Sequence, residues 1–441
     1  MKEKSVTTKS LFQYGLIAVP IAFAGFPLYI LAPDFYATHR GLSLTLLGSL
    51  LLSLRLFDAI LDPFIGWLID RLQGRFLTVT VSAAGIICLS IFGLFNFDFI
   101  TPAIWFVICT FFAVGSYSVL TITLGALATL WNNDKSDQTR IAGTREAFGL
   151  LGVITAVSLP TVLSRSAGPG HVYLWYASIL LLLMAAGILA FRQFLASAPK
   201  TEIPPKKIFV SIADGLQAVP PESKKLFVVY ALSMLASSVP AILVLFFVRD
   251  LLGAERLTGL FLLLYFLSGA AGMPLWKKLS FRLGKYKAWA LANTLAVAGF
   301  IGAFFLKTGD GWLYAPVCIV SGIALGADLI LPPSILADHI HARGNIAYSG
   351  MHYSFLSFLA KASLALASAA TLPLLDAAGF KPNAANTADA LLALSAAYAL
   401  IPCVLKLASA ALLYIFLIRS HTGGTYETVK THYNHRSNFH A

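Results

Sequence analysis

The stretch TVTVSAAGIICLSIFGLF, residues 78–95, contains no charged residue. Two similar stretches, LIAVPIAFAGFPLYILA at 16–32 and LWYASILLLLMAAGILAF at 174–191, also approach the roughly 20 residues with which an α-helix crosses a bilayer. Backbone amides in lipid must be hydrogen bonded within their own segment, so such runs predict transmembrane helices. A membrane β-barrel would instead show strands of about ten residues with alternating hydrophobicity, and the sequence has no such pattern.

The composition of the whole chain excludes an ordinary soluble protein. Of its 441 residues, 58% are hydrophobic and 12% are charged, whereas soluble domains carry about 25% charged residues. The net charge of +12 does not indicate nucleic-acid binding, because the basic residues separate the apolar runs instead of forming a patch. The four cysteines lie inside apolar runs and indicate neither disulfides nor a metal site.

Polar breaks divide the sequence into twelve predicted spans, which we place at 11–38, 42–70, 76–97, 101–131, 142–164, 172–195, 225–249, 256–280, 286–306, 311–337, 345–375 and 388–418. The longest break, 196–224, is rich in Pro and Lys. We therefore expect an N-terminal six-helix half at 1–195, a cytoplasmic linker at 196–224, a C-terminal half at 225–420 and a cytoplasmic tail at 421–441. The loop GWLIDRLQGRF at 66–76 and its counterpart WKKLSFRLGKYK at 276–287 suggest that the two halves arose by duplication, as in major facilitator carriers.

The distribution of basic residues predicts the orientation. If both termini are cytoplasmic, the opposite side carries only six of the 32 Lys and Arg residues, namely Arg40, Arg165, Arg249, Arg256, Lys307 and Lys381. This asymmetry favours cytoplasmic termini in a plasma (inner) membrane. The start of the chain is interpreted as a cytoplasmic tail, because it lacks a small-residue cleavage site.

Ionisable residues at mid-membrane depth cost about 2.5–3.5 kcal/mol each on insertion scales, so each one needs an explanation. Six fall there: Arg55, Asp58, Asp62, Asp328, Lys361 and Lys406. Three are acidic and three are basic, which fits a paired interior network better than charges facing lipid.

The second span carries the densest group of these charges. Arg55, Asp58 and Asp62 follow an i, i+3, i+7 spacing that places them on one helical face. Pro63 has no amide proton and leaves the carbonyl of Ala59 without its helical partner. Asp58 and Asp62 therefore form a candidate site for Na⁺ or for a proton. A buried Arg–Asp pair that only fixes helix packing is the alternative.

The other intramembrane charges have separate interpretations. Lys361, in the middle of the eleventh span, is a candidate counter-charge that competes with the cation for the carboxylates of the second span. The alternative is that it forms a fixed structural salt bridge. Asp328 precedes Pro332 and Pro333, which should bend the tenth helix. Asp328 is therefore either part of a gate or a packing residue. Lys406 is interpreted as a packing residue.

Residues at the ends of the spans suggest a gate. Asp70, Arg71 and Arg75 are candidates for a latch that closes the cytoplasmic side, although Arg71 and Arg75 also serve as orientation signals. Asp338, His339 and His341 fit a solvated turn better than a metal site. The sequence has no phosphate loop, nucleophile elbow or metalloprotease motif, so we expect neither an enzyme nor a cofactor.

The segment RLFDAILDPFIGWLIDR at 55–71 resembles the second-helix signature of the glycoside–pentoside–hexuronide:cation symporters, a branch of the major facilitator superfamily. The resemblance continues in TRIAGTREAFG at 139–149, ILADHI at 335–340 and YSFLSFLAKASLALA at 353–367. It implies that Asp58 and Asp62 bind the coupling cation, with Arg55 in the family's second-helix arginine position. It also implies that Lys361 lies close to the cation and substrate sites.

The chain departs from the sugar-binding members of this family. Ala22 stands where they carry an acidic residue in the first helix, and no acid appears near the end of the fourth helix. The first span has no acid, Asn or Gln from Leu16 to Pro33. Hydrogen bonds to a substrate could still come from Gln13, Tyr14 and Tyr29 in the first span and from Tyr117 in the fourth.

We expect a monomeric carrier of a small molecule in the lipid bilayer, coupled to Na⁺ or H⁺, with sugars or glycosides as the favoured substrates. A cation-coupled lysolipid or amphiphile carrier is one alternative. A membrane scaffold or receptor that does not transport is another, but such a protein would gain nothing from Asp58, Asp62 and Lys361.

Overall fold

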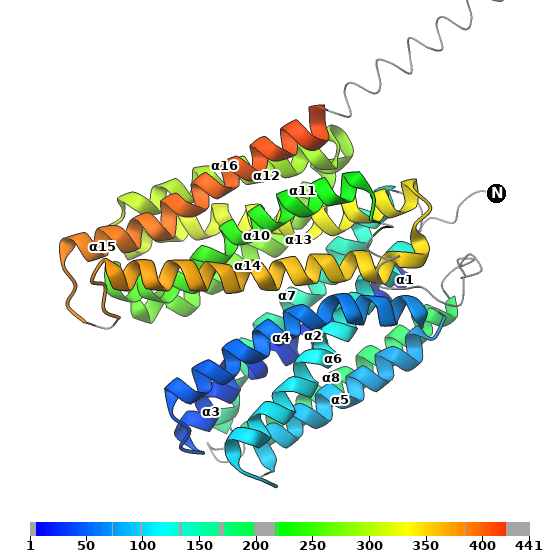
Figure 1. The fold of residues 1–441 in the computed structure, drawn as a ribbon, viewed down its shortest axis with the longest axis horizontal. Helices are drawn as coiled ribbons and strands as arrows, with labels where there is room; N and C mark the ends of the chain where they lie inside the picture. The colour runs from blue at the N-terminus through cyan, green and yellow to red at the C-terminus, as the bar shows by residue number, and fades with distance from the viewer. Residues whose placement is uncertain are drawn as a thin grey trace, which may run out of the picture. The chain divides into compact units, whose positions relative to one another are not determined.

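The computed structural model describes residues 6–72, 74–97, 99–131, 135–166, 172–197, 217, 219–382 and 384–419. Every regular element in these ranges is helical, and no β-strand occurs in them (Figure 1). The all-α fold predicted from the apolar runs is therefore confirmed.

The chain forms two compact units. The first comprises Met1–Pro220 and Leu329–Ala365, and the second comprises Pro221–Asp328 and Leu366–Ala441. Two helices, α13 (Gly311–Ala342) and α14 (Ser349–Ala377), contribute residues to both units. Most of the predicted linker at 196–224 and the predicted tail at 421–441 lie outside the described residues, so these boundaries stay predictions.

The first unit opens with a divided span, which we had expected as one helix at 11–38. It consists of α1 (Thr8–Gly15), α2 (Ala18–Phe26), the π-helical turn η1 (Pro27–Leu31) and α3 (Ala32–Thr38). Pro20, Pro27 and Pro33 have no amide hydrogen, so each removes one backbone hydrogen bond from this span and weakens the regular α-helix there.

The remaining helices of the first unit follow the predicted spans closely. They are α4 (Leu44–Arg71), α5 (Phe76–Asn96), α6 (Pro102–Trp131), α7 (Lys135–Ser166) and α8 (Val172–Ser197). Ser43 caps α4 by accepting a hydrogen bond from the amide of Leu46. The start of α7 lies seven residues before the predicted start at 142.

The second unit is also built of long helices joined by short turns. Its elements, with the shared helices α13 and α14, are α10 (Pro221–Phe246), η3 (Phe247–Leu251), η4 (Glu255–Leu257), α11 (Thr258–Leu283), α12 (Lys285–Phe300), η5 (Ile301–Phe305), α15 (Ala388–Ser395), η7 (Ala396–Leu400), α16 (Ile401–Leu413) and η8 (Tyr414–Ile418). The turn η6 (Ile346–Tyr348), between α13 and α14, belongs to the first unit. The helix α13 runs through Pro332 and Pro333 without an interruption.

Within the described ranges, ten helices are long and apolar enough to cross a membrane. Two further spans complete the predicted twelve. One is the divided first span, and the other is α4, whose apolar length is interrupted by Arg55, Asp58 and Asp62. The charges that set α4 apart are those that the sequence analysis singled out.

Small residues allow the helices of the first unit to approach closely. On α7, a Cβ added at Gly152 would lie 2.3 Å from the carbonyl oxygen of Val19 on α2, which is too close for any larger residue. Aromatic side chains fill the neighbouring interior, where Phe23 and Tyr176 stack with ring centroids 4.4 Å apart.

Candidate functional site

Two carboxylates of α4 meet a lysine of α14 inside the first unit. Lys361 Nζ lies 2.7 Å from Asp58 Oδ2 and 2.8 Å from Asp62 Oδ1. It also donates to Ser118 Oγ on α6 at 2.7 Å, and that hydroxyl donates to Asp58 Oδ1 at 2.9 Å. An ammonium has three N–H donors, and these three partners occupy all of them.

The carboxylates in this cluster are shielded from solvent and are not fully neutralised. Asp58 and Asp62 are 5% and 0% exposed, and the side chain of Lys361 is 21% exposed. Two carboxylates and one ammonium leave a formal charge of −1. Among the described residues, Asp62 Oδ2 has no hydrogen-bond partner, although Ser357 lies near the same carboxylate. A buried carboxylate oxygen without a partner is costly, and a monovalent cation or a proton would satisfy it.

The helices place these residues for simple geometric reasons. Asp58 and Asp62 are four residues apart and lie one above the other on the same face of α4. Arg55, which we expected on that face, is exposed instead. Seven residues are close to two turns, so Arg55 shares the helical face of Asp62 but lies about 10 Å away along α4, where the helix surface is exposed.

A second charged pair in the first unit was missed by the sequence analysis. On α7, Arg145 donates to Glu146 Oε1 through Nε at 2.9 Å and Nη2 at 2.5 Å, and the two side chains are 19% and 23% exposed. Tyr117 on α6 is close enough to interact electrostatically with both Glu146 and Asp58. The signal was the adjacent Arg and Glu in TREAFG. The pair lies inside the span predicted at 142–164 but close to its start, so it was not among the six charges that we placed at mid-membrane depth.

The other polar candidates of the first span are partly committed to packing. Tyr14 is fully buried and donates to the carbonyl of Leu124 at 2.7 Å, and Gln13 donates to Gln193 at 3.1 Å. The side chain of Tyr29 lies outside the described residues. Ala22 is half-buried.

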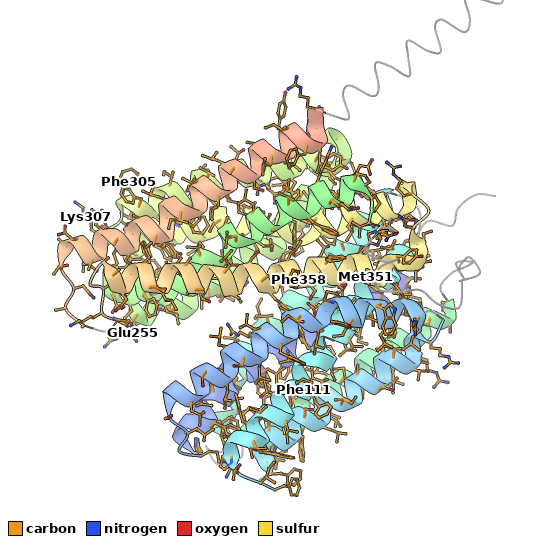
Figure 2. All side chains as sticks on the ribbon, in the orientation of Figure 1. Phe111, Glu255, Phe305, Lys307, Met351 and Phe358 are labelled. Carbon is orange, nitrogen blue, oxygen red and sulfur yellow. The ribbon has the colours of Figure 1, made fainter. Side chains whose placement is uncertain are left out.

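The carboxylate of Asp70 joins the end of α4 to the start of α14. Its Oδ1 accepts from the amide of Gly350 at 2.7 Å, and its Oδ2 accepts from the amide of Met351, in the first turn of α14 (Figure 2), at 2.9 Å. These amides have no partner within their own helix, and a carboxylate at a helix N-terminus is favoured by the helix dipole. Gly66 permits the close approach, since a Cβ there would lie 2.5 Å from Ser354 Oγ.

The two arginines predicted for the same gate are placed differently. The guanidinium of Arg71 lies 4.0 Å from the ring centroid of Trp67, an arrangement typical of a cation–π contact. Arg75 is exposed and lines a groove beside α5.

In the second unit, Asp328 and Lys406 form a buried ion pair. Lys406 Nζ lies 2.5 Å from Asp328 Oδ2 and donates to Ser233 at 2.8 Å, while Asp328 Oδ1 accepts from Trp289 Nε1 at 2.8 Å. Both oxygens of Asp328 therefore have partners. This arrangement fits helix packing better than ion binding, because no group is left for a ligand to satisfy.

The second unit also contains an aromatic cavity of about 150 Å³. Its lining includes Phe261, Tyr265, Phe266, Phe300 and the hydrogen-bonded pair Tyr314 and Tyr398. In the described parts of both units, no group of three or more His, Cys, Asp or Glu side chains could hold a metal ion.

The helical architecture and the charged interior of the first unit define a polytopic membrane carrier. The profile of the family "MFS/sugar transport protein" matches residues 11–420. The chain belongs to this family, so it is a transporter and not an enzyme, and it is an integral multi-pass membrane protein.

Individual relatives agree with this assignment. The chain is 23% identical to the "Glucuronide carrier protein homolog" of Escherichia coli, with 92% of this chain and 91% of the relative covered. It is 24% identical to the "Isoprimeverose transporter" of Lactiplantibacillus pentosus, with 89% and 85% covered.

Solved structures share the fold. A bacterial homologue of the iron transporter ferroportin in an outward-facing state has a TM-score of 0.69 at 15% identity, with 93% of this chain and 98% of that chain covered. The fucose:proton symporter of E. coli has a TM-score of 0.66 at 15% identity, with 92% and 96% covered. The predicted major facilitator fold is thereby confirmed.

Proposed function

We propose that the protein is a secondary active transporter that carries a sugar or glycoside together with Na⁺ or H⁺ by alternating access. The observation that carries this proposal is the buried cluster of Asp58, Asp62 and Lys361, which lacks one positive charge and leaves Asp62 Oδ2 without a partner. Buried groups of this kind are favourable only when a ligand completes them.

The geometry suggests how cation binding would act on the protein. A cation that binds Asp58 and Asp62 competes with Lys361 for the same oxygens, because the ammonium already donates to both carboxylates. Lys361 and the amides held by Asp70 belong to one helix, α14, so α4 holds α14 at two points. Binding of the cation would weaken one of these two attachments and thereby make α14 easier to move.

The substrate class rests on the relatives and on the Arg145–Glu146 pair. The two relatives described above are named for a glucuronide and for isoprimeverose. Arg145, Glu146 and Tyr117 offer hydrogen-bond donors and acceptors of the kind that sugar hydroxyls need when water is removed. These groups replace, in part, the acidic residues that Ala22 and the fourth helix do not supply.

A less polar substrate is the second candidate. The aromatic cavity of the second unit has apolar walls and pairs the hydroxyls of Tyr314 and Tyr398 with each other. Such a cavity suits an aryl group or an acyl chain better than a bare sugar. A glycoside with an apolar group, or an amphiphile such as a lysolipid, would use it.

The same proposal includes the setting of the protein in the cell. We place it in a plasma (inner) membrane as a monomer with both termini cytoplasmic. The excess of Lys and Arg in the loops between the apolar runs supports this orientation.

Transport in proteoliposomes tests the proposal. Asp58→Asn and Asp62→Asn should each abolish accumulation of a labelled glycoside driven by a Na⁺ or H⁺ gradient, because each removes a ligand of the cation. Asp376→Asn, at an exposed position of α14, is the control and should transport normally. Accumulation at the wild-type rate in both cluster variants would refute the cation site, and no solute-dependent flux in the wild type would favour the scaffold alternative.

A further inference from the structure

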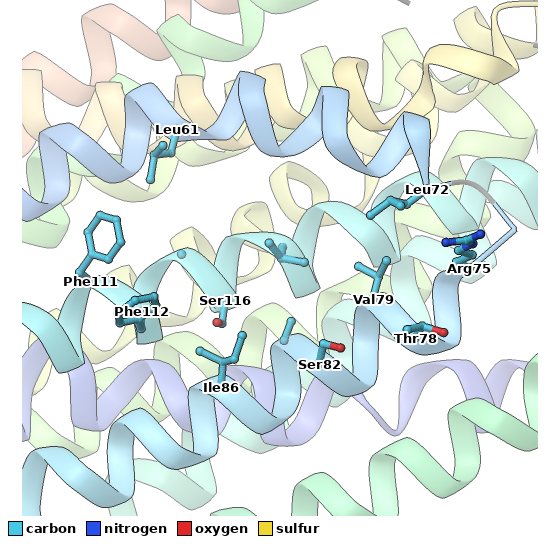
Figure 3. Close-up of a pocket in the computed structure, with 13 residues that line it drawn as sticks. Leu61, Leu72, Arg75, Thr78, Val79, Ser82, Ile86, Phe111, Phe112 and Ser116 are labelled. Atoms are coloured by element: carbon cyan, nitrogen blue, oxygen red, sulfur yellow. The ribbon is translucent and has the colours of Figure 1, made fainter. Parts of the chain in front are cut away.

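A groove of about 390 Å³ runs between α4, α5 and α6 of the first unit (Figure 3). It is more than twice the size of the ~150 Å³ cavity that holds a benzene ring in a well-studied case. Most of the residues that line it are apolar; the polar ones are Arg75, Thr78, Ser82 and Ser116, and Gly115 contributes its backbone.

The groove changes its chemistry from one end to the other. Arg75 stands at the end beside the α4–α5 turn, and the hydroxyls of Thr78 and Ser82 follow it along α5 (Figure 3). Beyond them the walls are apolar as far as Phe111 and Phe112, apart from the hydroxyl of Ser116. Ile86 is eleven residues from Arg75, or roughly 16 Å along the helix. A ligand that matches the groove therefore has an anionic head, a short polar segment and an apolar tail.

The charge at this end is available to a ligand. Arg75 is exposed, and among the described residues its guanidinium has neither an ion-pair nor a hydrogen-bond partner. The neighbouring charges of the turn are occupied, since Asp70 holds α14 and Arg71 lies against Trp67. The expected orientation puts this end on the cytoplasmic side, where anionic headgroups attract basic residues.

The apolar part of the groove opens on the outer surface of the unit. All three helices carry exposed apolar side chains, among them Ile86 and Phe112 of the lining, and Phe64, Leu68, Leu89 and Ile108 elsewhere on the same helices. In a membrane protein, such a surface faces acyl chains. At Gly115 the groove has free space, because a Cβ placed there would meet no atom within 4 Å.

We propose that this groove is a binding site for one anionic phospholipid, with an acyl chain between α4, α5 and α6 and the phosphate on Arg75. A lipid fits better than a soluble phosphate compound because most of the lining is apolar and only one end is charged. The site is separate from the cation cluster and does not depend on the proposed transport activity.

Native mass spectrometry of the full-length protein, titrated with phosphatidylglycerol or with phosphatidylcholine of the same chains, tests this proposal. Gly115→Leu fills the groove and should lower retention of phosphatidylglycerol at least about tenfold, because several methylenes lose their burial. Gly85→Leu is the matched control and should retain the lipid. Gly85 is an exposed glycine of α5 that does not line the groove, and a Cβ there would also meet no atom within 4 Å.

The contribution of the charge is tested separately. Arg75→Gln should reduce the preference for phosphatidylglycerol over phosphatidylcholine about fivefold, the size expected for one basic residue near an anionic surface. Arg282→Gln, at an exposed arginine of the second unit, should leave the preference unchanged. Thermal melting should show that all four variants are folded.

Three results would overturn the proposal. They are unchanged retention in Gly115→Leu, an equal loss in Gly85→Leu, or a preference for phosphatidylglycerol that survives Arg75→Gln. Displacement of the lipid by excess glycerol phosphate, which has no acyl chain, would instead assign the site to free phosphate compounds.

Discussion

Replacing Lys361 by alanine should destabilise the protein in a way that a cation reverses. The substitution removes the single ammonium that lies between Asp58 and Asp62, and it leaves two carboxylates that are 5% and 0% exposed. Removal of one partner of a buried ion pair costs about 3–5 kcal/mol. Because the Lys361 side chain is 21% exposed, we expect the lower end of this range.

A cation that binds only the folded protein stabilises it by RT ln(1 + [L]/Kd), where [L] is the free cation concentration. At a hundredfold excess over its dissociation constant this stabilisation is about 2.7 kcal/mol. That value nearly equals the expected loss, so a saturating coupling cation should restore almost all of the stability of Lys361→Ala. The wild type should gain less, because Lys361 already occupies the same oxygens.

The assay is thermal melting of purified protein in NaCl, in choline chloride of equal ionic strength, and over a range of pH. Lys406→Ala is the matched control. It also breaks a buried pair, but it leaves one carboxylate whose Oδ1 is held by Trp289, so its rescue should be smaller. Coupled transport should fall more in Lys361→Ala than in Lys406→Ala. The reasoning is refuted if Lys361→Ala melts like the wild type in choline, or if neither Na⁺ nor protons raise its melting temperature more than that of Lys406→Ala.

Three further predictions concern the gate and the substrate. Asp70→Asn should weaken the attachment of α14 to α4 by about 1.5–3 kcal/mol, because the charged acceptor of two backbone amides is lost. Hydrogen exchange of the amides in the first turn of α14 should then accelerate. Unchanged exchange would contradict the role of Asp70 in holding α14. Glu146→Gln removes the carboxylate partner of Arg145. The ratio of the affinity for a glucuronide to the affinity for a neutral glycoside, measured by calorimetric titration, should rise about tenfold, or ~1.4 kcal/mol. An unchanged ratio would show that the pair does not contact the substrate. Melibiose should bind weakly or not at all in Na⁺ and an aryl galactoside better, whereas micromolar binding of melibiose that is lost in Asp62→Asn would show that a sugar-binding carboxylate had been misplaced.

The sequence determined the class of protein and the positions of nearly all helices. The bilayer imposes helices on long apolar runs, and each such run is readable without any knowledge of its neighbours. The exceptions have local causes. Prolines divide the first span, and α7 begins seven residues early at Lys135, because polar residues at a helix end resemble a loop in sequence.

The sequence also identified Asp58 and Asp62 as a pair, since residues four apart share a helical face. It singled out Lys361 as a deep charge, but it did not indicate that this ammonium donates to Asp62, 299 residues away, and to Ser118. Spacing along one helix does not determine which face of another helix it will meet.

Tertiary structure alone decided which charges are satisfied. It joined Asp328 to Lys406 and left Asp62 Oδ2 without a partner among the described residues. It assigned Asp70 to the start of α14 and Arg75 to a groove, although the two residues are only five positions apart in the sequence. A buried charge takes its role from the atoms within hydrogen-bonding distance, and those atoms come from helices that only folding brings together.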